Sequence, residues 1–159
     1  MADLPNFFTL SRKVGESFPG ELTIVLMTAI GMLVAHALLI LLIGKIYQML
    51  IDWADSRNIF WLSIPFYMIA VGLVFMTHLV DIVVWSYALI ALKIFAIDTN
   101  AFYFAGEMYT TVGYGSFPLP DNWKILPIVV AFSGIFAASM SGAVLFNMIG
   151  QIIRKKTVQ

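Results

Sequence analysis

The stretch Thr110–Phe117, which reads TTVGYGSF, places hydroxyl groups, a tyrosine and two closely spaced glycines in a chain that is otherwise mostly apolar. Gly113 and Gly115 can adopt positive φ angles because they have no Cβ atom. They alternate with Val112 and Tyr114, so successive backbone carbonyls can turn toward the same side. This spacing therefore predicts a row of carbonyl oxygens along one side of the segment.

A single row of oxygens cannot surround an ion, but four copies of the chain around one axis can. Each copy would supply the carbonyls of residues 111–114, and the hydroxyl of Thr111 would close the inner end. Rings of this kind replace the water shell of a dehydrated monovalent cation. The predicted ion-binding segment comprises Thr111, Val112, Gly113, Tyr114 and Gly115.

The segment before this stretch, Asn100–Thr110, can form a helix that is too short to span a bilayer. The two glycines and then Pro118 and Pro120 follow it at once. Irregular backbone at membrane depth is tolerated only inside protein or beside a water-filled cavity. We therefore expect a re-entrant half-helix followed by a loop.

The composition is that of a membrane protein. Of the 159 residues, 61% are hydrophobic and only 11% charged, against roughly 25% charged residues in soluble domains. Basic and acidic residues number nine each, so the net charge does not favour a nucleic-acid partner. The chain has no Cys, and its two histidines fall on different predicted helices, far from any plausible cleft. Because no catalytic, metal-ligand or phosphate-loop arrangement is present, we expect neither an enzyme nor a cofactor.

Three stretches without Asp, Glu, Lys or Arg exceed the ~20 residues that a helix needs to cross a bilayer. They are Leu22–Gly44, Asn58–Val80 and Ile125–Ile153. We therefore expect an all-α membrane protein with three transmembrane helices. The polar break Asp52–Asn58 divides it into residues 1–57, with the first helix, and residues 58–159, with the other two and the loop between them.

Basic residues predict the orientation. Residues 154–156, RKK, directly follow the third helix and are expected in the cytoplasm by the positive-inside rule. Lys45 and Arg57 lie near the linker that the same topology makes cytoplasmic. The N-terminus and the loop after the second helix are then external, and Arg12 and Lys13 disagree mildly with this orientation.

Apolar character continues beyond the second predicted span. We expect a crossing from about Phe60 to Asp81, followed by an extension over Ile82–Ile97 at or above the outer interface. Trp85 and Tyr87 are expected to anchor that extension at the interface, with Lys93 pointing to water.

The segment Thr111–Gly115, TVGYG, resembles the filter signature of potassium channels. The similarity covers about Ala101–Gly150 and is greatest to bacterial two-transmembrane potassium channels. It includes an aromatic pair, a double threonine, a tryptophan that opens the inner helix and a glycine at the family's hinge position: Tyr103 with Phe104, Thr110 with Thr111, Trp123 and Gly134. The resemblance implies a homotetramer around a central pore in a multi-pass cell membrane protein, here of the bacterial inner membrane. Potassium would be the permeant ligand, and Tyr103, Phe104 and Thr110 would support the filter.

The chain departs from this pattern after the filter. Family members commonly carry Asp directly after GYG, where this chain has Ser116. Glu107 stands where some bacterial channels have a glutamate that contacts the Asp and stabilises the filter. A carboxyl group behind the filter must be protonated or hydrogen-bonded to filter amides, Tyr103 or Ser116. The alternative is a solvated glutamate at a wide vestibule.

Gly134, Ala138 and Gly142 recur every four residues and share one face of the third helix. This spacing is typical of close helix packing, and the resemblance adds the alternative of a gating hinge at Gly134. Asn147 lies further toward the cytoplasm, where it would line the pore or gate, or form an interhelical hydrogen bond.

His78 and Asp81 lie three residues apart and are expected to meet on one helix face. The pair is either proton-sensitive or a satisfied pair that anchors the outer extension. For His36 we expect a packing hydrogen bond to a neighbour. Gly31 and Ala35 offer a close-contact face for the first helix.

Three functions remain open on these residues. The first is passive, potassium-selective conduction by a homotetramer in the lipid bilayer. The second is a weakly selective monovalent cation channel, because Ser116 replaces the family's Asp. The third is a non-conducting regulatory subunit whose first helix docks a partner. The chain has only three arginines, so no arginine-rich voltage-sensing helix is expected.

Overall fold

The computed structural model describes residues 6, 8, 9, 12 and 20–158, and within them the fold is entirely helical. Lys13 therefore lies outside the described part. Three helices are long and apolar enough to cross a membrane, which confirms the predicted all-α class with three membrane-spanning candidates. The elements are α2 (Glu21–Ser56), η1 (Phe60–Leu62), α3 (Ser63–Ala91), α4 (Asp98–Tyr109), η2 (Asp121–Trp123) and α5 (Leu126–Val158).

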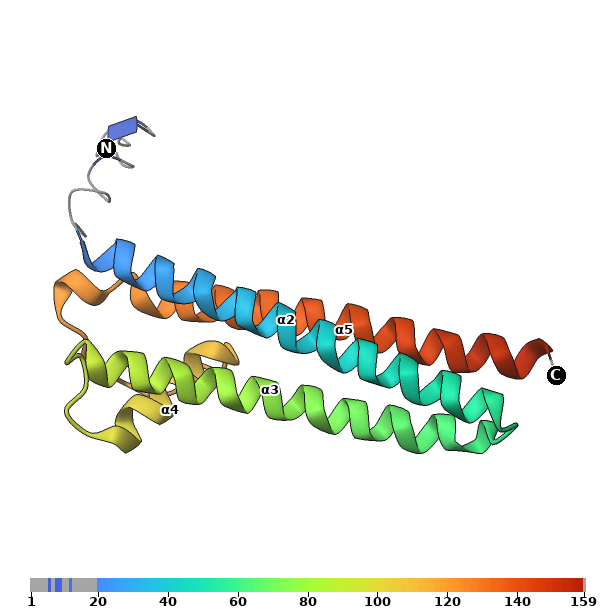
Figure 1. Ribbon diagram of the computed structural model, residues 1–159. Helices are drawn as coiled ribbons and strands as arrows, with labels where there is room; N and C mark the ends of the chain where they lie inside the picture. Colours follow the sequence, from blue (N-terminus) through green and yellow to red (C-terminus); the bar gives the residue numbers. More distant parts are fainter. Residues whose placement is uncertain (1–5, 7, 10–11, 13–19, 159) are drawn as a thin grey trace.

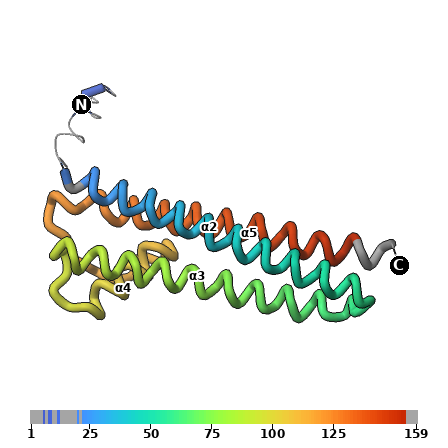
Figure 2. Tube along the Cα trace, in the orientation of Figure 1, coloured from blue at the N-terminus to red at the C-terminus, as the bar shows by residue number. Residues whose placement is uncertain are grey.

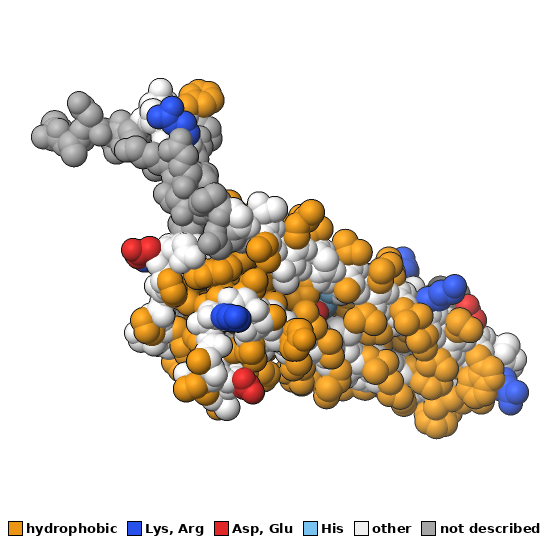
Figure 3. Space-filling model, turned by 60° about the vertical axis from the view of Figure 1, so that its left-hand side comes forward, with side chains coloured by type: hydrophobic (Ala, Val, Ile, Leu, Met, Phe, Trp, Pro, Cys, Tyr) orange, Lys and Arg blue, Asp and Glu red, His pale blue; other side chains and the backbone are white. Residues whose placement is uncertain are grey.

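The long helices lie side by side along most of their length (Figures 1 and 2). α3 runs antiparallel to α2 and α5, so the α2–α3 turn and the C-terminus lie at one end of the bundle, while α4 and the following loop lie at the other. In the view of Figure 3, hydrophobic side chains cover the flank and the charged groups gather near the two ends, apart from a small spot of carboxylate and histidine midway.

Helix α2 packs against both α3 and α5 along one narrow stripe. The buried residues of the stripe are spaced three or four apart, as in coiled-coil seams: Val25, Ala29, Met32, His36, Ile40, Ile43, Tyr47, Ile51 and Ala54. Gly31 and Ala35 lie outside the stripe and are exposed, and nothing approaches the position of a Gly31 Cβ within 4 Å. Within one chain, the larger stripe residues rather than Gly31 and Ala35 therefore make the contacts of the first helix.

The turn between α2 and α3 is shorter than the polar break Asp52–Asn58. α2 continues to Ser56, and Asn58 reverses the chain with a φ of 58°. The amide of Ile59 then donates to the carbonyl of Ala54 at 2.9 Å. Only residues 57–59 therefore separate α2 from η1, which leads directly into α3.

Helix α3 continues without interruption past Asp81 to Ala91. Trp85 is only 1% exposed, and its indole N–H donates to the Ser133 hydroxyl at 2.9 Å. The prediction that Trp85 is an interfacial anchor is therefore wrong: its ring fills the core between α3 and α5. Tyr87 and Lys93 are exposed, and Lys93 turns the chain toward α4 with a φ of 57°.

Two separate apolar clusters form the core. The cluster nearer α4 includes Met32, Ile82 and Ala137, and the other includes Ile40, Val74 and Met148. On each long helix, the residues between the two clusters include a buried polar side chain: His36 on α2, Asp81 on α3 and Ser141 on α5. A buried polar layer therefore divides the bundle.

Candidate functional site

The short helix before the TVGYG segment is α4, and it begins two residues earlier than expected. It packs against α3 and α5 at the end of the bundle. Its last turn is continued by backbone bonds from Thr110 to Gly106 at 3.0 Å, from Thr111 to Met108 at 3.0 Å and from Val112 to Glu107 at 2.9 Å. The Thr110 hydroxyl also donates to the Gly106 carbonyl at 2.6 Å. The start of the TVGYG segment is therefore tied to the end of α4.

Beyond this turn the TVGYG segment has no regular secondary structure. Gly113 adopts a φ of 58°, as expected for a glycine. The second positive φ is at Thr111, at 61°, and not at Gly115. A β-branched residue in this region stores strain, and such outliers gather at functional sites. Within the described residues, no hydrogen bond ends on the carbonyl oxygens of residues 111–114.

Glu107 lies behind the segment and is bonded to it. Its side chain is buried, and one carboxylate oxygen accepts a hydrogen bond from the Gly115 amide at 2.7 Å. A Cβ on Gly115 would lie 2.5 Å from that oxygen and 2.5 Å from the Phe117 ring. Gly115 is thus required for close approach rather than for its φ angle. This geometry does not fit a solvated glutamate at a wide vestibule.

We expect Glu107→Val to weaken the segment, because the Gly115 amide would lose a charged acceptor worth about 1.5–3 kcal/mol. Glu107→Gln retains a neutral acceptor and should show a smaller effect. Current decay and reversal potentials in mixed potassium and sodium, recorded in planar bilayers, measure both changes. Unchanged decay and selectivity in Glu107→Val would contradict a supporting role for this carboxylate.

The aromatic pair of α4 is divided between two environments. Phe104 is buried against Phe95 and Phe117, with ring centroids 5.1 and 5.6 Å away. Tyr103 is 60% exposed, and Tyr114 is 78% exposed. Phe104 therefore fills the core beneath the segment, whereas Tyr103 is exposed in the single chain, and the predicted support of the filter by these two residues stays a prediction. Val112, Thr110 and Ser116 are exposed as well.

No protein-family model, curated protein or solved structure matches this chain. What the chain does must therefore be inferred from its own residues.

Gly134 lies at a close contact between α4 and α5. It is buried, and a Cβ there would lie 2.8 Å from the Tyr109 carbonyl carbon and closer still to its oxygen. Ala138 and Gly142 on the same face are exposed. Packing thus accounts for Gly134, while the proposed hinge stays a prediction. Asn147 is exposed at the far end of α5, in a hollow that it shares with Phe146 and Arg154.

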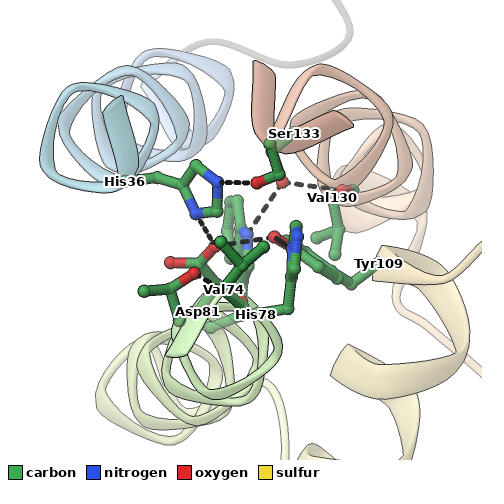
Figure 4. Close-up of polar contacts among 10 residues, drawn as sticks. His36, Val74, His78, Asp81, Tyr109, Val130 and Ser133 are labelled. Atoms are coloured by element: carbon green, nitrogen blue, oxygen red, sulfur yellow. Dashed lines mark hydrogen bonds and ion pairs between the residues drawn. The ribbon is translucent and has the colours of Figure 1, made fainter. Parts of the chain in front are cut away.

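His78 and Asp81 share a face of α3, and both contact the Tyr109 hydroxyl of α4. Tyr109 donates to Asp81 at 2.6 Å, and His78 Nδ1 lies 2.9 Å from the Tyr109 oxygen. His36 of α2 joins them, with Nδ1 2.6 Å from Asp81 (Figure 4). Its Nε2 lies 2.9 Å from the hydroxyl of Ser141 on α5. The two imidazole rings lie 4.9 Å apart and are tilted by 44°. His78 also lines a cavity of about 370 Å³, so the expectation that both histidines lie far from any cleft is wrong for His78.

This polar cluster contains possible metal ligands. One atom each from His36, His78 and Asp81 lies within 4.8 Å of the others. Tetrahedral zinc would hold its ligand atoms about 3.3 Å apart, whereas His36 Nδ1 and Asp81 are only 2.6 Å apart and joined by a hydrogen bond. The direct hydrogen bonds therefore occupy the atoms that a metal would need.

Proposed function

We propose that the chain forms a homotetrameric, potassium-selective channel that passes ions down their electrochemical gradient. The observation that carries the proposal is the segment Thr111–Gly115. It follows a short helix at one end of a membrane-type bundle, bends through positive φ at Thr111 and Gly113, and has carbonyls at residues 111–114 that accept no hydrogen bond within the described chain. Such carbonyls are suited to replace the hydration shell of a cation.

The exposed surface near the segment supports assembly of several copies. Val112 is 59% exposed, and Phe132, Ile135 and Phe136 expose a large part of their apolar side chains on α5. Irregular backbone is not tolerated against lipid, because its polar groups would find no partners. Four copies around an axis would cover this backbone, and the re-entrant placement of α4 would aim the four segments at the shared pore.

The proposal also includes an orientation in the bilayer. The α2–α3 turn carries Arg57, and α5 reaches Arg154 at the same end of the bundle. The positive-inside rule would place this end in the cytoplasm and the TVGYG segment near the opposite face. The membrane we propose is a bacterial inner membrane.

The full chain, purified and reconstituted in liposomes, is expected to take up potassium and to behave as a tetramer in native mass measurements. In bi-ionic recordings the reversal potential should follow the potassium gradient, because sodium fits the carbonyl rings less well. A reversal potential near zero would instead indicate the weakly selective cation channel, in line with Ser116 after the filter. Protein that carries no flux under any ionic condition would support the regulatory subunit.

A further inference from the structure

The polar cluster between the two apolar clusters forms one connected chain of hydrogen bonds across α2, α3, α4 and α5, most of which can be followed in Figure 4. Asp81 is its centre, because a single carboxylate oxygen lies 2.6 Å from both His36 Nδ1 and the Tyr109 hydroxyl. Ser141 lies at one end, with its hydroxyl 2.9 Å from His36 Nε2, and His78 lies at the other end, with Nδ1 2.9 Å from the Tyr109 hydroxyl. Ionisable groups inside a membrane bundle are costly and usually serve a function.

One consistent assignment of the hydrogens satisfies every contact of this cluster. Tyr109 donates its only hydroxyl proton to Asp81, so His78 must donate its Nδ1 proton to the Tyr109 oxygen. His36 donates from Nδ1 to Asp81, and its Nε2 then accepts the proton of Ser141. Each of these contacts therefore pairs a donor with an acceptor, and none of them requires a bound metal ion. The cluster therefore forms a hydrogen-bonded unit that fixes the positions of its side chains.

Tyr109 links this unit to the TVGYG segment. It is the last residue of α4, and Thr111, with its strained φ of 61°, follows two residues later. The backbone of Tyr109 is pressed against α5 at Gly134, while its side chain is held by Asp81. A cavity of about 370 Å³ on the side of this contact is lined by His78, Tyr109, Thr111 and Gly134, among others. A displaced Tyr109 ring would therefore move the first residues of the segment.

We infer that Asp81 is a positioning residue for the ion filter. Its carboxylate, oriented by His36 of α2, fixes the Tyr109 hydroxyl and through it the backbone of Thr110 and Thr111. This inference rests on the proposed channel function and gives α2 a role in it: the first helix supplies the partner that holds the carboxylate. Asp81 acts through Tyr109 and does not itself touch the ion.

The test is the sodium-to-potassium permeability ratio of the full chain in planar bilayers. Tyr109→Phe keeps the ring but removes the hydroxyl, and it is expected to raise this ratio by about tenfold, equivalent to about 1.4 kcal/mol. Asp81→Leu should act in the same direction. Asp81→Asn keeps an oxygen that accepts from both His36 and Tyr109, so it should retain most of the selectivity.

The matched control is Tyr47→Phe. Tyr47 is a buried tyrosine on the α2 stripe whose hydroxyl lies 3.4 Å from the Met148 carbonyl, in the apolar cluster away from α4. Its loss should leave the permeability ratio unchanged. A merely structural role of the polar cluster would lower the yield of folded protein in the Asp81 and Tyr109 variants without altering the selectivity of those channels that conduct.

Two outcomes separate this inference from the proposed function. If wild-type protein is potassium-selective and Tyr109→Phe behaves like Tyr47→Phe, the positioning role is overturned while the channel function stands. If wild-type protein passes no potassium, both are overturned. Should Asp81→Leu fail to assemble, Tyr109→Phe decides, because it changes neither charge nor ring volume.

Discussion

Replacement of Gly113 by alanine is expected to reduce potassium flux through the reconstituted protein by at least about a hundredfold. The φ of Gly113 is 58°, and a residue with a Cβ atom in this left-handed region is disfavoured by about 1–2 kcal/mol. In the proposed tetramer the cost recurs in each of four subunits. The alanine would drive the backbone to negative φ and turn a ring of carbonyl ligands away from the ion.

The matched control for this change is Gly31→Ala. Gly31 lies within α2, is exposed, and has no atom within 4 Å of a Cβ built on it. Potassium uptake into liposomes, measured at equal amounts of protein, should be the same as in wild type for this variant. Equal uptake by Gly113→Ala and Gly31→Ala would refute an ion-conducting role for the carbonyls of residues 111–114.

Replacement of Gly134 by alanine is expected to destabilise the protein by about 1–3 kcal/mol or more, because an added methyl group would overpack a closed contact. The added methyl group would clash with the backbone carbonyl of Tyr109, and no change of side-chain rotamer can relieve this clash. Either α4 or α5 must shift. At roughly 2–4 °C per kcal/mol, the unfolding midpoint in detergent should fall by several degrees, and flux should fall as well.

Gly72→Ala is the control for this prediction. Gly72 lies in the middle of α3, exposed and without a neighbour within 4 Å of its Cβ position, so alanine there should leave the midpoint unchanged or raise it slightly. A hinge at Gly134 that did not depend on the α4 contact would give a different result. Gly134→Ala would then unfold at the wild-type temperature and change only the fraction of time that the channel is open.

The long elements were predictable because a single strong signal determines each of them. Uncharged runs of more than 20 residues defined three membrane-type helices, and the tight turn chemistry after residue 110 predicted a short helix followed by a loop. The ends of the helices were harder to predict. Asp52 and Asp55 are helical although their charge suggested a break, because the stripe residues Ile51 and Ala54 remain buried and carry α2 on to Ser56.

The contacts between helices could not be read from the sequence. His36 looked isolated because its partners, Asp81 and Ser141, are 45 and 105 residues away. One signal was available: His36 stands in the seam spacing of α2, between Met32 and Ile40, where an apolar residue is expected. A polar residue in such a position requires a buried partner. Trp85 was misplaced for the same reason, since its core position depends on Ser133.

The polar layer between the two apolar clusters also limits how far the helices can slide past one another. Apolar contacts tolerate a shift along the axis, because one methyl group replaces another at little cost. The layer does not, because a displacement of α2 by one turn, about 5.4 Å, would leave the carboxylate of Asp81 facing Met32 or Ile40 instead of His36, and neither side chain has a donor. A single polar position can fix the alignment of a bundle in this way, and here four helices would share one axial setting.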